Sequence, residues 1–320
     1  MKTTHLLLTT FCLCALGART EASTLYGSTS AGGAGELWII DATTGTGLQD
    51  VGPLSDAGSV NYPVTGLAFH PVTGVLYGST GGTFPTPELL QINPTNAQVT
   101  VVGAYGAGAG VTMADIAFDS AGHLYGVSSS GGANLYSINT ATGQATKIGT
   151  SGVGSTTGGG FAISSAGVFF GSPIKTDFGT FNPTNGVFSN ITNPAKPAGA
   201  TASYGSLAFD GSTLYGMNLG TPTHLVIFDA LGNVTDVGPS VTSVDGIAFK
   251  PSPALTIQRA TNGALITWPV WADGYRLQQN YQLGTTNWVT PTNSVTLTST
   301  NNQVTISPLA TNTYFRLISP

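Results

Sequence analysis

GLAFHPVTGVLYGST, residues 66–80, is the stretch that decides the fold, because close copies of it return along the chain. They include DIAFDSAGHLYGVSS from Asp115 and SLAFDGSTLYGMN from Ser206. A catalytic motif normally occurs once in a chain, whereas a motif that recurs at a regular interval is typical of a repeated structural unit. The aromatic residues of its second half follow one another at intervals of 51, 48, 45 and 45 residues, at positions 26, 77, 125, 170 and 215.

Each repeat contains four short segments that are rich in apolar and aromatic residues. In the third copy they are DIAF (115–118), LYG (124–126), LYSIN (135–139) and ATKIG (145–149). Such segments, separated by Gly, Asn, Asp and Thr-Gly turns, are typical of β-strands. Five copies of a four-strand unit at this period predict an all-β, five-bladed β-propeller over residues 23–250. The glycine of LYG is expected to let the second strand leave the sheet or neighbouring blades approach closely.

The two ends of the repeat region begin and finish at different points of the unit. The region begins with a second segment, Leu25–Gly27, and finishes with a first segment, GIAF at 246–249. We therefore expect the last strand to complete the sheet that the first strands begin, a 3+1 ring closure. Pairing the two ends satisfies the N–H and C=O groups that open sheet edges would leave exposed.

The third segment of each copy ends in Asp or Asn before a turn. Such side chains accept hydrogen bonds from their own turn, which favours a structural role. A ring of metal ligands is the alternative interpretation. The five residues are Asp41, Asn93, Asn139, Asn182 and Asp229.

The repeat phrases carry a family resemblance. The combination of LYG, L-x-x-I-N-x-x-T-G-x-x-T-x-V-G and G-L-A-F resembles a family of secreted bacterial propeller-repeat proteins of unknown function. LYSINTATGQATKIG, residues 135–149, is close to its consensus, and FGTFNPTNGVFSNI, residues 178–191, departs most. The resemblance covers about residues 24–250. It implies a propeller fold and supplies no catalytic residues.

The N-terminus predicts secretion. Lys2 and His5 precede an apolar run from Leu6 to Ala18, which is short for a membrane span, and small residues follow it. We expect residues 1–22 to be a signal peptide, with a signal anchor as the alternative. Both cysteines, Cys12 and Cys14, lie inside this segment, so the mature secreted or cell-surface chain would contain no disulfide or thiolate metal site.

Charged residues are scarce, at 7% of the 320 residues, against about 25% in a typical soluble protein. The formal net charge is −5, and it becomes −6 without residues 1–22. The few cations are scattered, which argues against nucleic acid or anionic lipid as a partner. With 41% hydrophobic residues, the chain can form a core, and we expect no membrane span in the mature protein.

Residues 251–320 follow a different pattern, with seven short alternating segments that predict a small antiparallel β-sandwich. Trp268, Tyr275, Leu277, Trp288 and Phe315 are the expected core. ITWP, GYRLQQ and the terminal YFRL resemble a fibronectin-type-III-like module, although the chain ends without a further strand. The resemblance implies a spacer or attachment domain. Trp271 is either a partly buried surface residue or a carbohydrate-binding residue.

Two acids precede or begin predicted inner strands, Asp115 and Asp245. Paired carboxylates can act as acid and base in glycoside hydrolysis. A hydrolase of glycosides or lactones that uses these two residues is therefore the alternative function. Glycine dominates the equivalent positions in the other copies, which favours a structural role in which the two acids cap or cross-link strand ends.

A second set of polar residues directly precedes each third segment, and Phe84 lies in one of the loops before them. Such loops commonly surround a ligand site in propellers. We call the six the rim residues: Glu36, Phe84, Glu88, Asn134, Asp177 and His224. The three histidines at 70, 123 and 224 fall at different points of the repeat, so we expect no metal site, and no cofactor motif is present. The sequence favours a non-enzymatic binding or scaffold protein whose ligand is a glycan or an extracellular protein.

Overall fold

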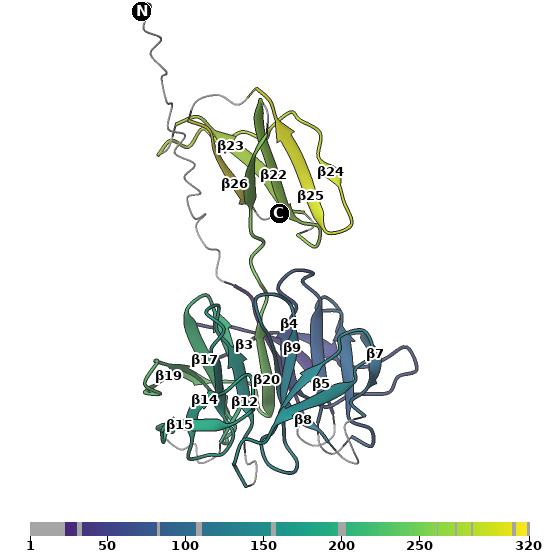
Figure 1. Cartoon of the computed structure of the whole chain (residues 1–320), viewed down its shortest axis with the longest axis vertical. Helices are drawn as coiled ribbons and strands as arrows, with labels where there is room; N and C mark the ends of the chain where they lie inside the picture. Colours follow the sequence, from purple (N-terminus) through teal and green to yellow (C-terminus); the bar gives the residue numbers. More distant parts are fainter. Residues whose placement is uncertain are drawn as a thin grey trace, which may run out of the picture. The chain divides into compact units, whose positions relative to one another are not determined.

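A computed structural model of the chain describes residues 23–30, 34–81, 84–106, 111–154, 158–197, 203–260, 262–272, 274–282, 284–308 and 312–318. The chain divides into a compact unit of Ser23–Pro251 and a second unit that contains the residues from Ser252 onward (Figure 1). Every regular element within these described residues is a β-strand, so the fold is all-β. The predicted signal peptide, residues 1–22, lies outside the described residues.

The unit Ser23–Pro251 is built from five four-stranded antiparallel sheets. Four of these sheets contain four strands that are consecutive in the chain. The strands are β1 (Leu25–Thr29), β2 (Glu36–Ile40), β3 (Gly47–Pro53), β4 (Val64–Phe69), β5 (Leu76–Thr80), β6 (Glu88–Ile92), β7 (Val99–Ala104), β8 (Met113–Phe118), β9 (Leu124–Ser128), β10 (Leu135–Ile138), β11 (Ala145–Gly149), β12 (Gly160–Ile163), β13 (Phe169–Ser172), β14 (Phe178–Phe181), β15 (Phe188–Thr192), β16 (Tyr204–Asp210), β17 (Thr213–Asn218), β18 (His224–Phe228), β19 (Val234–Pro239) and β20 (Val244–Phe249).

The remaining sheet brings together the two ends of this unit, in the order β20-β1-β2-β3. Leu25 lies opposite Phe249 and Gly27 lies opposite Ile247 in the β1–β20 pair. Just outside the strands, the Lys250 N–H donates a 2.9 Å hydrogen bond to the Thr24 carbonyl. The GIAF segment therefore pairs with the edge that β1 would otherwise expose.

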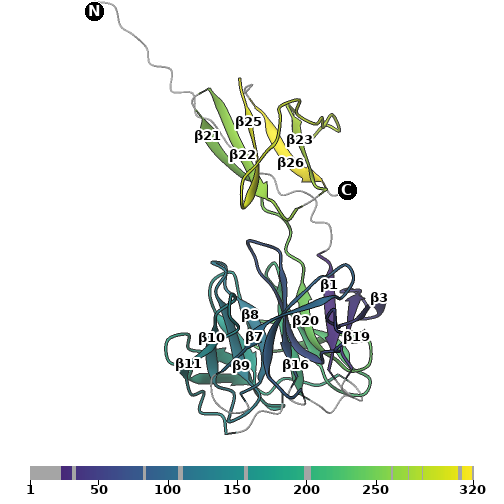
Figure 2. The ribbon, with the colours of Figure 1, turned by 90° about the vertical axis from the view of Figure 1, so that its right-hand side faces the viewer.

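The first strands of the five sheets contact one another in turn: β20 with β4, β4 with β8, β8 with β12, β12 with β16, and β16 with β20. In Figure 2, β8, β16 and β20 lie towards the middle of this unit, and β3, β11 and β19 lie towards its sides. Four-stranded sheets that meet through their first strands give the unit a propeller-like fold.

Contacts between neighbouring sheets explain why the repeated phrase carries both a Phe and a Tyr. The second-strand aromatic of one sheet packs on the first-strand Phe of the next sheet, and such pairs contribute about 0.5–1.5 kcal/mol beyond area burial. The fourth sheet has Ile163 in place of that Phe, and Tyr125 packs instead on Phe169, 4.9 Å between ring centroids. The other pairs are Tyr26 with Phe69 (5.5 Å), Tyr77 with Phe118 (5.4 Å), Phe170 with Phe209 (5.9 Å) and Tyr215 with Phe249 (4.8 Å).

The LYG glycine makes room within its own sheet. A Cβ on Gly78 would lie 2.7 Å from Cδ1 of Ile92, the last apolar residue of the third strand. A Cβ on Gly27 would lie 2.5 Å from Cδ1 of Ile40 in the first sheet. The closest contact is therefore a third-strand side chain of the same sheet, where the sequence suggested an approach between blades or a strand that leaves the sheet.

The turns between third and fourth strands use the Asx chemistry that the sequence predicts. The Asn93 Oδ1 accepts hydrogen bonds from the Thr95 N–H at 2.9 Å and from the Thr95 hydroxyl at 2.7 Å. The side-chain oxygens at these positions thus serve their own turns, which favours the structural role over a ring of metal ligands. The equivalent backbone contacts join Asp41 to Thr43, Asn139 to Ala141, Asn182 to Thr184 and Asp229 to Leu231.

The described residues of the second unit form six strands, where the sequence suggested seven. They form the sheets β21-β22-β25-β24 and β23-β26. Val289, in the segment NWVT at residues 287–290, makes an isolated bridge to Gln279 instead of forming a strand. The strands are β21 (Thr256–Ala260), β22 (Gly263–Pro269), β23 (Arg276–Asn280), β24 (Thr296–Leu297), β25 (Asn301–Ile306) and β26 (Tyr314–Ile318).

Trp268, Leu277 and Phe315 are buried in the core of this unit, as the sequence predicts. Trp288 is half-buried outside that core cluster, with the Arg316 guanidinium 4.3 Å above its ring. Trp271 is partly buried and packs against the core. Among the described residues, no helix has the length and apolar character needed to cross a membrane.

Candidate functional site

The two candidate carboxylates occupy different positions of the repeat. Asp115 lies within β8, and Asp245 lies one position earlier in the repeat, within β20. The residues equivalent to Asp115 are small because the first strands approach closely, and a Cβ on Gly66 would lie 2.7 Å from the Asp115 Cα. The small residues at this position are Gly66, Gly160, Ser206 and Gly246.

Asp115 is completely buried and its carboxylate joins three first strands. Its Oδ2 accepts hydrogen bonds from the N–H of Phe161 in β12 at 2.9 Å and from the N–H of Leu207 in β16 at 3.1 Å. Its Oδ1 accepts the N–H of Ile116 at 3.0 Å. The carboxylate thus supplies acceptors for backbone donors of two other sheets at the point where first strands meet.

Ser206 extends this contact to the sheet that contains both ends of the unit. Its side chain hydrogen bonds to Asp115, and its Oγ accepts the Ile247 N–H of β20 at 3.1 Å. Burial raises the pKa of Asp115 well above its usual range, although the Phe161 and Leu207 N–H groups act in the opposite direction. We use the name Asp115 hub for Asp115, Ser206 and the three backbone N–H groups that donate hydrogen bonds to the Asp115 carboxylate.

Asp245 has a separate set of neighbours. It is the extra residue of a β-bulge in the β1–β20 pair, a feature that can redirect a side chain. The Ser30 hydroxyl donates a 2.6 Å hydrogen bond to its Oδ2, and Gly205 leaves space for its Oδ1. Burial raises the pKa of Asp245 to about 6. Because Asp115 is enclosed and the two carboxylates have different partners, this arrangement does not support their use as an acid–base pair.

The rim residues that precede third strands lie at equivalent places in their sheets. Glu36, Glu88 and His224 begin β2, β6 and β18, and Asn134 and Asp177 directly precede β10 and β14. A hydroxyl at the end of the second strand connects to this point, as the Thr80 Oγ1 accepts the Glu88 N–H at 2.8 Å. The equivalent bonds are Glu36 N–H to Thr29 Oγ1 (2.9 Å), Asn134 N–H to Ser128 Oγ (3.1 Å) and Ser172 Oγ to the Asp177 carbonyl (2.8 Å).

The side chains of the rim residues differ in exposure and partner. Glu88 is half-buried, and burial raises the pKa of its carboxyl group. Phe84 packs on Tyr62 with 4.9 Å between ring centroids. Asn134 is buried and donates to the Gly131 carbonyl at 3.0 Å. Asp177 accepts the Thr176 hydroxyl at 3.3 Å, and the Glu36 carboxylate accepts the Trp38 indole N–H at 3.4 Å.

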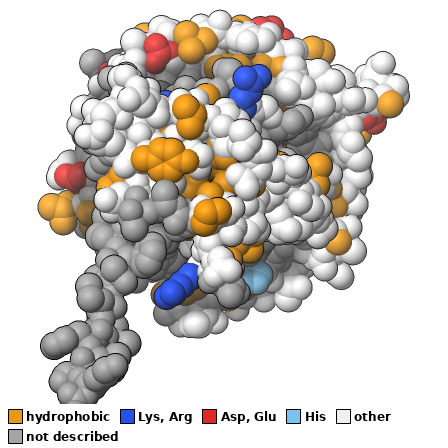
Figure 3. Space-filling view, turned by 90° about the horizontal axis from the view of Figure 1, so that it is seen from above, with side chains coloured by type: hydrophobic (Ala, Val, Ile, Leu, Met, Phe, Trp, Pro, Cys, Tyr) orange, Lys and Arg blue, Asp and Glu red, His pale blue; other side chains and the backbone are white. Residues whose placement is uncertain are grey.

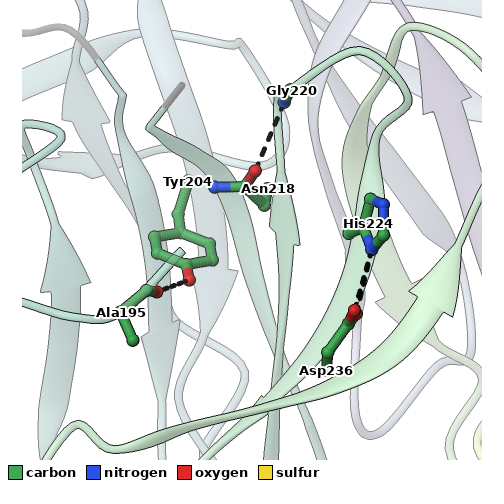
Figure 4. A network of polar contacts seen from close by, with 6 residues as sticks. All are labelled: Ala195, Tyr204, Asn218, Gly220, His224 and Asp236. Atoms are coloured by element: carbon green, nitrogen blue, oxygen red, sulfur yellow. Dashed lines mark hydrogen bonds and ion pairs between the residues drawn. The ribbon is translucent and has the colours of Figure 1, made fainter. Parts of the chain in front are cut away.

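His224 has an acidic partner that the sequence did not indicate. Its Nδ1 lies 3.0 Å from Oδ1 of Asp236, and the His224 side chain is 11% exposed (Figure 4). Nearby, the Tyr204 hydroxyl donates to the Ala195 carbonyl at 2.6 Å. Burial raises the pKa of Tyr204. Across the described part of the chain, no three His, Cys, Asp or Glu side chains gather as a metal site requires.

The sequence from residue 26 to residue 246 matches the repeat of unknown function DUF6923. The chain belongs to the DUF6923 repeat family. The matched region contains all six rim residues, Asp115 and Asp245. No curated protein is significantly similar to this DUF6923 chain in sequence.

Several solved structures are similar to this DUF6923 protein at low sequence identity. TolB from Acinetobacter baumannii is 14% identical with a TM-score of 0.42, and the match covers 92% of this chain and 66% of TolB. A protein of unknown function from Bacteroides caccae is 12% identical with a TM-score of 0.44, over 72% of this chain and 99% of that one. A protein of unknown function from Bacteroides thetaiotaomicron is 15% identical with a TM-score of 0.41, and the match covers 67% of this chain and 64% of that one.

Proposed function

We propose that residues 23–250 form a closed five-bladed propeller that serves as a secreted or cell-surface binding or scaffold protein without enzymatic activity. The five four-stranded sheets and the β20–β1 pair support the closed propeller. The contact between the fifth and first sheets through Tyr215 and Phe249 supports it as well. In this proposal residues 1–22 are the signal peptide and residues 251–320 are a fibronectin-like spacer.

The observation that carries the non-enzymatic role is the Asp115 hub. A general acid must reach substrate, yet the Asp115 carboxylate is enclosed and accepts backbone N–H groups of two other sheets. Asp115, one of the two candidate catalytic acids, therefore connects neighbouring sheets. The alternative hydrolase would have to work with Asp245 alone.

The ligand in this proposal is a glycan or an extracellular protein that meets the loops between second and third strands. Glu36, Glu88 and His224 begin the third strands of three sheets, so they lie at the same end of those sheets. Lys, Arg, Asp and Glu make up only 7% of the residues of the whole sequence, and they are few and set apart on the one face that Figure 3 draws. A surface with so few charges suits a neutral or weakly charged ligand better than an ionic one.

The experiment measures binding of the purified chain that begins at Ser23 to an array of glycans and to immobilised extracellular-matrix proteins. We expect retention on at least one class, with a loss in Phe84→Ala and Glu88→Gln. Thr100→Ala, on the exposed outer strand of the same sheet, is the matched control and should bind normally. Absence of binding to both classes, or cleavage of a glycoside or lactone that Asp245→Asn abolishes, would overturn the proposal.

A further inference from the structure

The third sheet, which contains β8 to β11, has a hollow of about 420 Å³. The hollow lies at the end of the sheet opposite to the rim residues. It lies where the turn between β8 and β9 meets the turn between β10 and β11. Its volume falls within the range of about 300–1,000 Å³ that is usual for small-molecule sites. Among its lining residues are His123, Tyr125, Ser137, Asn139, Gln144 and Thr146.

The hollow follows from one small residue in a row that crosses the sheet. Ser137 of β10 lies between Tyr125 of β9 and Thr146 of β11, and residues opposite one another share a face of a sheet. The residues equivalent to Ser137 in the other four sheets are all larger: Ile39, Gln91, Thr180 and Ile227.

The second sheet shows what a larger residue does at this place. Gln91 extends along the row and its Nε2 donates a 3.1 Å hydrogen bond to the Tyr77 hydroxyl. Tyr77 is the residue equivalent to Tyr125. With Ser137 in that position, the third sheet leaves the space beside Tyr125 open.

The polar groups around the hollow both donate and accept hydrogen bonds. Ser137, Thr146 and Gln144 contribute two hydroxyls and an amide. The His123 Nδ1 lies 2.9 Å from Oδ2 of Asp119, whose Oδ1 accepts the N–H groups of Ala121 and His123. When Nδ1 carries the hydrogen, Nε2 of this exposed imidazole is an acceptor.

Tyr125 supplies an aromatic surface of fixed orientation, because its ring packs edge-to-face on Phe169. The lining residues include no Lys, Arg, Asp or Glu, and the neighbouring Asp119 carboxylate is already hydrogen-bonded to His123 and Ala121, so the lining offers no Lys or Arg to select a phosphate or a carboxylate. A neutral ligand with many hydroxyl groups matches an aromatic ring surrounded by hydroxyl, amide and imidazole groups.

We propose that this hollow binds one neutral sugar unit of a glycan. The inference rests on the proposed binding function, but it places a site at the opposite end of the sheet from the rim residues. Ser137 is the residue that creates the site, and Tyr125 is the ring on which the sugar lies.

The test is binding of the chain that begins at Ser23 to an array of neutral oligosaccharides of glucose, galactose, mannose, xylose and N-acetylglucosamine. Ser137→Ile fills the hollow with a residue that two other sheets accept at the same place. Thr180→Ile places the same residue at the equivalent position of the fourth sheet and is the control. We expect Ser137→Ile to weaken binding about tenfold or more, because the larger side chain occupies the ligand's volume, and Thr180→Ile to bind normally. Equal thermal unfolding midpoints would show that both variants are folded.

Two results would overturn the hollow as a sugar site. One is an array on which no neutral sugar retains the unaltered chain. The other is sugar binding that Ser137→Ile leaves unchanged. If that binding is instead lost in Phe84→Ala, or if the chain retains an extracellular protein, the binding function at the rim residues stands while the inference about the hollow fails.

Discussion

At the scale of single residues, the same side-chain type has opposite consequences at different depths. Asp41, at the chain surface, has a lowered pKa because Thr43 donates hydrogen bonds to its carboxylate. Asp115 and Asp245 have raised pKa values because burial disfavours their charged forms. Protonation of the fully buried Asp115 and of the half-buried Asp245 is therefore linked to stability.

Removing the Asp115 carboxylate should destabilise the repeat unit strongly. Asp115→Ala leaves the Phe161 and Leu207 N–H groups buried without acceptors, each at a cost of about 1–3 kcal/mol. Asp115→Asn keeps one oxygen acceptor, so its loss should be smaller. Urea unfolding measures both, with Asp50→Ala on the exposed strand β3 as the control. A stability for Asp115→Ala equal to that of the control would contradict the hub.

Asp245 should make stability depend on pH in a defined direction. Its pKa is about 6 in the folded chain and about 3.9 in an unfolded one, so the folded state binds the proton more tightly. This contribution is fully present below about pH 4 and is lost as pH rises through 6. Acids with lowered pKa values, such as Asp41, act in the opposite direction.

The comparison with Asp245→Asn separates these effects. The unfolding free energy of the unaltered chain, minus that of the variant, should fall between pH 4.5 and pH 7.5 by an amount of order 1 kcal/mol. Urea unfolding at the two pH values gives the difference. A difference that stays constant, or that increases with pH, would show that the Asp245 pKa is not raised.

At the scale of strands and turns, much of the fold could be predicted because each repeat contains the same four apolar segments separated by the same kinds of turn. The Asx turn at Asn93 and its equivalents depend on neighbouring residues, so local sequence suffices for them. The Asp115 hub depends on N–H groups 46 and 92 residues away, and no local pattern identifies such donors. The hollow beside Ser137 required the strand register, since only register shows which residues share its row.

The LYG glycine can be tested as an element-level fit between two strands. In Gly78→Ala the new Cβ lies 2.7 Å from Cδ1 of Ile92, and overpacking of this kind costs about 1–3 kcal/mol. Ile92→Val deletes that methyl group, and alone it costs about 0.5–1.5 kcal/mol. The loss of unfolding free energy in the double variant should be smaller than the sum of the two single losses, by about 0.5 kcal/mol or more. A double-mutant cycle by urea unfolding measures this coupling, and simple additivity would contradict the contact.

At the scale of the molecule, the sequence order of segments indicated which strand would join the two ends of the repeat unit. The Tyr of the second strand in one sheet packs on the Phe of the first strand in the next sheet. Each copy of the repeat therefore needs a neighbouring copy to cover its aromatic side chains. Phe249 of β20 meets this requirement for Tyr215, while β20 pairs with β1. The second unit repeats no phrase, and there the position of Trp288 over Arg316 did not follow from the alternating pattern.

A disulfide between the two ends provides the most direct test of closure, because the chain from Ser23 onward contains no cysteine. Thr24 and Lys250 are joined by a backbone hydrogen bond of 2.9 Å, and paired antiparallel residues have Cα separations of about 5.5 Å, within disulfide range. Thr24→Cys with Lys250→Cys should form the bond on mild oxidation and increase the unfolding free energy by about 2–4 kcal/mol, reversed by reductant. Thr24→Cys with Lys147→Cys, on the outer strand β11, should keep two free thiols and the original stability. If both pairs remain reduced, the ends do not lie side by side and the closed propeller is wrong.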